Sequence, residues 1–77
     1  MDKEKYLAQR RSEIAHNIRK LRQYNGWSQQ QVADYLACSR RRVCRVESEH
    51  VEFAVAELEL LAQAFRVPLA QLLASAA

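Results

Sequence analysis

Two serines, Ser28 and Ser39, constrain the fold of this chain more than any other feature. A serine just before a helix accepts a hydrogen bond from a free backbone N–H of the first turn, so each one marks a helix start. Gln31 follows Ser28 by three residues, where a capping box places Glu or Gln. The spacing therefore predicts two short helices, over about 29–36 and 40–48, joined by a tight turn.

Apolar residues at helical spacing predict three more helices around this pair. Ile14, Ile18 and Leu21 indicate a helix over about 12–24, after which Gly26 can adopt the left-handed conformation that ends it. Leu7 continues the same stripe toward the N-terminus.

Beyond a loop over 49–54, the stretch from Val55 to Phe65 is amphipathic, and Pro68 suits the first turn of a last helix over about 68–74. With 77 residues, one glycine and one proline, the chain is too short for a second core and too poor in turns for hairpins. We therefore expect an all-α, compact five-helix bundle that forms one domain over 1–77, in which residues 1–11 are an N-terminal extension of helical pattern.

The predicted helix over 40–48 carries charge on one side only. At about 100° per residue, Val43, Val46 and Glu47 share its inner side. The opposite side holds Arg40, Arg41, Cys44, Arg45 and Ser48. Clustered arginines repel one another, so an anionic partner explains them better than folding does, although a solvated basic face is the alternative. Arg42 points sideways, which leaves a phosphate contact or an internal ion pair as its role.

The stretch WSQQQVADYLACSRRRVCRVE resembles the helix-turn-helix of the Cro and phage-repressor family, which has the lambda-repressor-like DNA-binding fold. IRKLRQYNG upstream and LELLAQAFRVPLAQLL downstream follow the family's order, and the helix-turn-helix covers about residues 29–48. The chain departs from the pattern at Ala37, where relatives usually have glycine. Its loop after the third helix also lacks the glycine and proline often seen there.

The resemblance implies roles for particular residues. Base contacts in the major groove are implied for Gln29, Arg40, Arg41 and Arg45, and phosphate contacts for Ser28 and Ser48, to which we add Arg42. Arg22 and Glu47 lie on the inner edges of their helices, and the family also implies that they form a structural ion pair. A domain this small is not expected to cover Leu69, Leu72 and Leu73 without a partner, so we assign them to a homodimer interface.

Other chemistries find little support in the sequence. Neither His16 nor His50 lies near a serine or cysteine in a sequence pattern typical of a catalytic nucleophile, so we expect no enzyme activity. Cys38, Cys44 and His50 do not have the spacing of a zinc site, and reduced thiols are the default. We interpret Cys44 as a small side chain that fits close to DNA, and a redox role for its thiol is the weaker alternative. We expect no metal, cofactor or small-molecule effector. No apolar stretch suits a membrane span or signal peptide, which predicts a cytoplasmic protein.

These features predict a sequence-specific regulator of transcription that binds double-stranded DNA. We expect a dimeric repressor or autoregulator that reads a near-palindromic operator through residues 40–48. The alternative is a protein-interaction module, such as an antitoxin, in which DNA binding is secondary or absent. RNA binding is disfavoured because exposed aromatic platforms for single strands are missing from the pattern.

Overall fold

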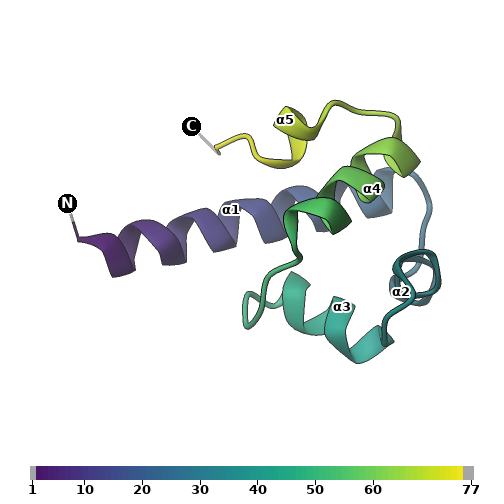
Figure 1. Cartoon of the computed structure of the whole chain (residues 1–77), viewed down its shortest axis with the longest axis horizontal. Helices are drawn as coiled ribbons and strands as arrows, with labels where there is room; N and C mark the ends of the chain where they lie inside the picture. The colour runs from purple at the N-terminus through teal and green to yellow at the C-terminus, as the bar shows by residue number, and fades with distance from the viewer. Residues whose placement is uncertain (1, 76–77) are drawn as a thin grey trace.

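Five α-helices make up the computed structural model, which describes residues 2–75 (Figure 1). They are α1 (Lys3–Tyr24), α2 (Gln29–Leu36), α3 (Arg40–Glu47), α4 (Val55–Phe65) and α5 (Leu69–Leu72). No strand occurs within the described residues. The predicted all-α, five-helix fold is confirmed, and α3 and α5 are slightly shorter than expected.

Helix α1 begins much earlier than the predicted start near residue 12. The Asp2 carboxylate caps it by accepting hydrogen bonds from the backbone N–H groups of Glu4 at 3.0 Å and Lys5 at 3.4 Å. Residues 3–11 therefore belong to α1, whose N-terminal turns project past the other helices (Figure 1). This agrees with the helical pattern expected of the segment from Leu7, although none of residues 2–9 is buried.

Local hydrogen bonds set the boundaries of α2 and α3 as predicted. Ser28 Oγ accepts from the N–H of Gln31 at 3.0 Å, and Gln31 Oε1 accepts from the N–H of Ser28 at 2.7 Å. Ser39 Oγ caps α3 by accepting from the N–H of Arg42 at 3.1 Å. Between the helices, Ala37 adopts the left-handed conformation, with φ 56°, at a cost of about 1 kcal/mol for a residue other than glycine.

The core forms where α1, α2, α3 and α4 meet, and α5 closes it. Its largest fully buried side chains are Ile18, Val32, Val43, Leu61 and Leu72. The side-chain amide of Asn17, on α1, fixes the end of α5 by donating to the carbonyls of Leu72 at 3.0 Å and Ala74 at 2.8 Å.

The burial of Leu72 corrects one expectation. This side chain has 0% exposure within a single copy of the chain, so it is not available to a second copy. Leu69 and Leu73 are half-buried and pack against the same core. The three leucines were expected to need a partner because the sequence does not show that α5 folds back onto α1.

Candidate functional site

A buried ion pair fixes the inner side of α3. The Arg22 guanidinium donates to Glu47 through Nε at 2.6 Å and Nη2 at 2.9 Å, so the two residues form the pair expected of them. Arg22 Nη1 also donates to the carbonyl of Trp27 at 2.9 Å. The two side chains are only 12% and 4% exposed. The Arg22 guanidinium thus joins α1 to α3 and to the turn before α2.

The opposite side of α3 forms an open, basic hollow of about 750 Å³. Its lining residues are Gln29, Arg40, Arg41, Cys44, Arg45, Ser48 and His50. The three arginines are exposed, and no carboxylate among residues 2–75 pairs with them. Their guanidinium groups are therefore free to donate to an external anion, with the fork geometry that suits phosphates and guanine edges.

Five of the residues predicted to contact DNA line this hollow, but two of them also bond within the chain. Gln29 Nε2 donates to Glu47 Oε1 at 3.2 Å, which ties its amide to the buried pair. The Ser48 hydroxyl donates to the carbonyl of Cys44 at 2.8 Å. Ser28 does not line the hollow, and its hydroxyl caps α2.

Arg42, which the sequence analysis assigned to a DNA phosphate, has a partner within the chain. Both of its terminal nitrogens donate to the Glu57 carboxylate on α4, Nη2 to Oε1 at 2.7 Å and Nη1 to Oε2. The guanidinium carbon also lies 5.1 Å from the centroid of the Phe53 ring. Of the two roles that the sequence left open, the fold selects the ion pair, because the 49–54 loop returns α4 to the side of α3.

His50 belongs to the hollow although the sequence reasoning assigned it no contact. Its Nδ1 lies 3.0 Å from Ser48 Oγ, which holds the ring beside the end of α3. The signal available in the sequence was its place two residues after Ser48, immediately past the arginine-bearing helix. The loop's departure from the family pattern obscured that signal.

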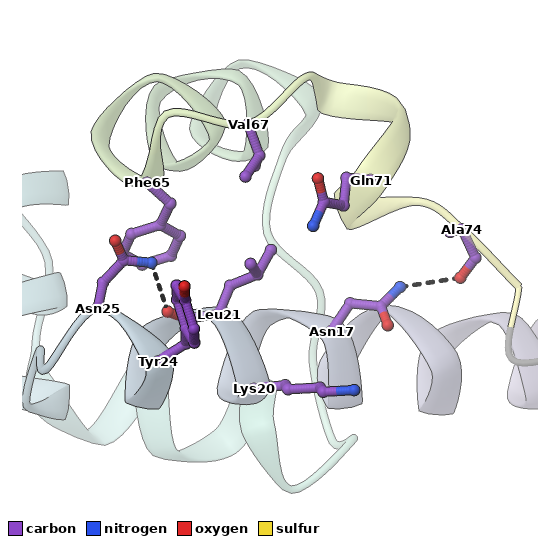
Figure 2. A pocket seen from close by; sticks show the side chains of 9 residues that line it. All are labelled: Asn17, Lys20, Leu21, Tyr24, Asn25, Phe65, Val67, Gln71 and Ala74. Atoms are coloured by element: carbon purple, nitrogen blue, oxygen red, sulfur yellow. Dashed lines mark hydrogen bonds between the residues drawn. The ribbon is translucent and has the colours of Figure 1, made fainter.

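A second hollow, of about 480 Å³, lies between α1 and the segment that joins α4 to α5. Figure 2 shows Phe65, Val67 and Gln71 facing Leu21 and Tyr24 across it. Lys20 is the one charged side chain among its lining residues, so it lacks the concentrated charge of the hollow on α3.

Neither metal ligands nor a membrane span emerge from the described part of the chain. Residues 2–75 contain no group of three or more His, Cys, Asp or Glu placed to hold a metal ion. Cys38 and Cys44 are free thiols, half-buried and exposed respectively. No helix within 2–75 combines the length and apolar character needed to cross a membrane.

Comparison with known proteins places this geometry in a family context. The helix-turn-helix family model HTH_3 matches residues 18–72, which include the whole of α2, α3 and α4. A curated relative, the competence pilus inhibition repressor of Acinetobacter baylyi, is 35% identical over 60 residues. The match covers 78% of this chain and 54% of the relative, so the chain spans about half of that protein's length.

Solved structures agree on the fold. A hypothetical transcription factor from Neisseria, NHTF, superposes with a TM-score of 0.77 at 33% identity, covering 87% of this chain and 77% of that one. The restriction-modification controller protein C.AhdI from Aeromonas hydrophila gives 0.72 at 24% identity, covering 80% of this chain and 94% of its own. The second likeness shows the fold alone.

Proposed function

This chain belongs to the HTH_3 helix-turn-helix family, and on that basis we propose that it is a DNA-binding regulator of transcription that reads operator sequence with α3. The observation that carries the proposal is the basic hollow on α3. Three exposed arginines stand there, none of them paired with a carboxylate within residues 2–75, while the Arg22–Glu47 pair fixes the opposite side of the helix. That arrangement suits a helix that enters a major groove with its N-terminal half.

Within this proposal, base reading belongs to Arg40, Arg41 and Arg45, together with Gln29. A guanidinium can donate to O6 and N7 of guanine at once, which distinguishes that base from the others. Contacts with the DNA phosphates belong to Ser48 and His50, which line the hollow, and to Ser28, which caps α2 next to Gln29. The Acinetobacter relative is named as a repressor, which supports negative regulation of transcription as the output.

Dimerisation is the second part of the proposal. Since Leu72 is buried within one chain, the contact between copies would rest on Leu69 and Leu73, which keep part of their surface exposed. A twofold dimer reads a near-palindrome, with half-sites about 10 bp or 34 Å apart. Sedimentation at high micromolar concentration should show a dimer that Leu69→Asp dissociates. A monomer under those conditions, with and without DNA, contradicts this part.

The test of DNA binding compares nucleic acids directly. Enrichment of bound duplexes from a random library should yield one near-palindromic sequence. The affinity for that duplex should exceed the affinity for a scrambled duplex and for single-stranded RNA at every salt concentration. Equal affinity for all three would show a charged face without sequence reading. Absence of binding to any nucleic acid would favour the protein-interaction alternative.

A further inference from the structure

Arg42 stands apart from the other arginines of α3 because a carboxylate of its own chain already occupies it. Its two terminal nitrogens donate to the two oxygens of Glu57, in the bidentate arrangement by which guanidinium groups also bind phosphate. The Phe53 ring supports the guanidinium at 5.1 Å. The Glu57 carboxylate therefore takes the place that a DNA phosphate could take on this side chain.

Arg42 is nevertheless close to the proposed DNA-binding surface. It borders a hollow of about 290 Å³ that is also lined by Ser39, Arg41 and Arg45. Its side chain is 35% exposed, so solvent and dissolved anions can reach it. The ion pair with Glu57, and not burial, keeps this cation from acting with its neighbours on α3.

Glu57 is itself held in place for this contact. Its Oε1 accepts a hydrogen bond from the backbone N–H of Ala54 at 2.8 Å, at the start of α4. The hydrogen bond from Arg42 lowers the pKa of Glu57, so the carboxylate stays charged at neutral pH. The same contact raises the pKa of Arg42. A fixed anion of this kind competes with backbone phosphates without needing to be ordered first.

We propose that Glu57 is a specificity-determining residue that withholds Arg42 from the DNA backbone by standing in for a phosphate. The inference rests on the proposed DNA-binding function. A phosphate contact strengthens binding to every sequence alike, whereas base contacts separate one sequence from another. By removing one cation from the backbone contacts, Glu57 lowers nonspecific affinity and leaves discrimination to Arg40, Arg41 and Arg45.

The experiment measures affinity for a scrambled duplex and for the enriched duplex at several salt concentrations. Glu57→Gln is the informative variant, since the amide oxygen can still accept from the N–H of Ala54 while the charge is lost. Glu52→Gln is the matched control: it removes the same charge from an exposed residue that pairs with Arg11 at 3.3 Å. Glu57→Gln should bind the scrambled duplex more tightly than the control does.

The salt dependence distinguishes release of Arg42 from a change in net charge or fold. For Glu57→Gln, the plot of log affinity against log salt should steepen by about 0.9 for each protomer bound, because one phosphate contact is gained. The ratio of specific to nonspecific affinity should fall. Adding Arg42→Gln to Glu57→Gln should restore the original slope. An unchanged slope, or weaker binding to both duplexes, overturns the proposal.

A second variant decides the question if Glu57→Gln does not fold. Arg42→Gln alone should leave the wild-type slope unchanged, because Arg42 is not a backbone contact while Glu57 holds it. A shallower slope would show that Arg42 already binds phosphate and would overturn the inference. Wild-type binding to the enriched duplex tests the proposed function separately, and its absence overturns both proposals.

Discussion

The arginines on α3, together with Arg22 packed against it, divide into two groups by where their partners lie. Arg22 and Arg42 each bond to a carboxylate of the same chain, Glu47 and Glu57 respectively. Arg40, Arg41 and Arg45 are exposed and meet no carboxylate among residues 2–75. The charge of an arginine therefore does not by itself indicate its role. The location of its partner separates those that stabilise the fold from those available to a ligand.

The Arg22–Glu47 and Arg42–Glu57 pairs also differ from each other in burial. The side chains of Arg22 and Glu47 are 12% and 4% exposed, whereas those of Arg42 and Glu57 are 35% and 21% exposed. Removing one member of a buried pair leaves an unpaired charge away from water, but at a half-exposed pair water can replace the lost partner. We therefore expect variants of the buried pair, of the outward arginines and of the half-exposed pair to differ in their effects on stability and on DNA affinity.

The largest effect is expected at the buried pair. Glu47→Ala should lower the free energy of unfolding by about 3 to 5 kcal/mol, because Arg22 would keep its charge without its partner. Denaturant midpoints measure this loss. Glu59→Ala, the same change at an exposed position of α4, is the control and should have a small effect. Similar losses of unfolding free energy in both variants would show that the Arg22–Glu47 pair stabilises the fold no more than a surface charge does.

The outward arginines should show the reverse behaviour, with affinity lost and stability kept. Arg41→Ala should weaken binding to the enriched duplex by about 1 to 3 kcal/mol and relax the preference at one base pair of each half-site. Thermal unfolding should be nearly unchanged because Arg41 bonds to no carboxylate within 2–75. Arg19→Ala removes an exposed arginine from α1 and serves as control. If Arg41→Ala weakens enriched and scrambled duplexes equally, Arg41 does not read bases.

The smallest effect concerns the half-exposed pair and depends on pH. The hydrogen bond from Arg42 lowers the pKa of Glu57 below its unfolded value, which is about 4.3 for glutamate. The pair's stabilisation is therefore fully present above that pH and disappears as the pH falls through the folded-state pKa. At pH 7, Glu57→Gln should cost about 0.5 to 1 kcal/mol, since the exposure of Arg42 weakens the interaction.

Unfolding curves of wild type and Glu57→Gln from pH 7 downward test this expectation. The difference between the two should shrink as the pH falls below about 4.3, the unfolded-state pKa of glutamate, and through the lowered folded-state pKa of Glu57. A difference that persists at low pH would mean that the charge of Glu57 is not the source of the stabilisation. That result would mean that the Arg42–Glu57 ion pair does not contribute to the stability of the fold.

The sequence by itself determined the features that depend on neighbouring residues. Ser28, Gln31 and Ser39 bond to backbone groups within three residues, so the starts of α2 and α3 could be predicted. The sides of α3 follow from helix geometry alone, which predicted the outward arginines. Asp2 was the equivalent local signal for α1, but Leu7 alone continued the apolar stripe toward it, so the exact start of the helix could not be predicted.

Only the tertiary structure decided the features that depend on distant segments. Leu72 is buried because α5 folds back onto α1, where Asn17 binds its carbonyl from 55 residues away. Arg42 bonds to Glu57 because the loop over 49–54 returns α4 to α3, and His50 enters the basic hollow through the same loop. Sequence spacing fixes which side of a helix a residue occupies. The path of the loops decides what lies opposite that side, because no local hydrogen bond specifies it.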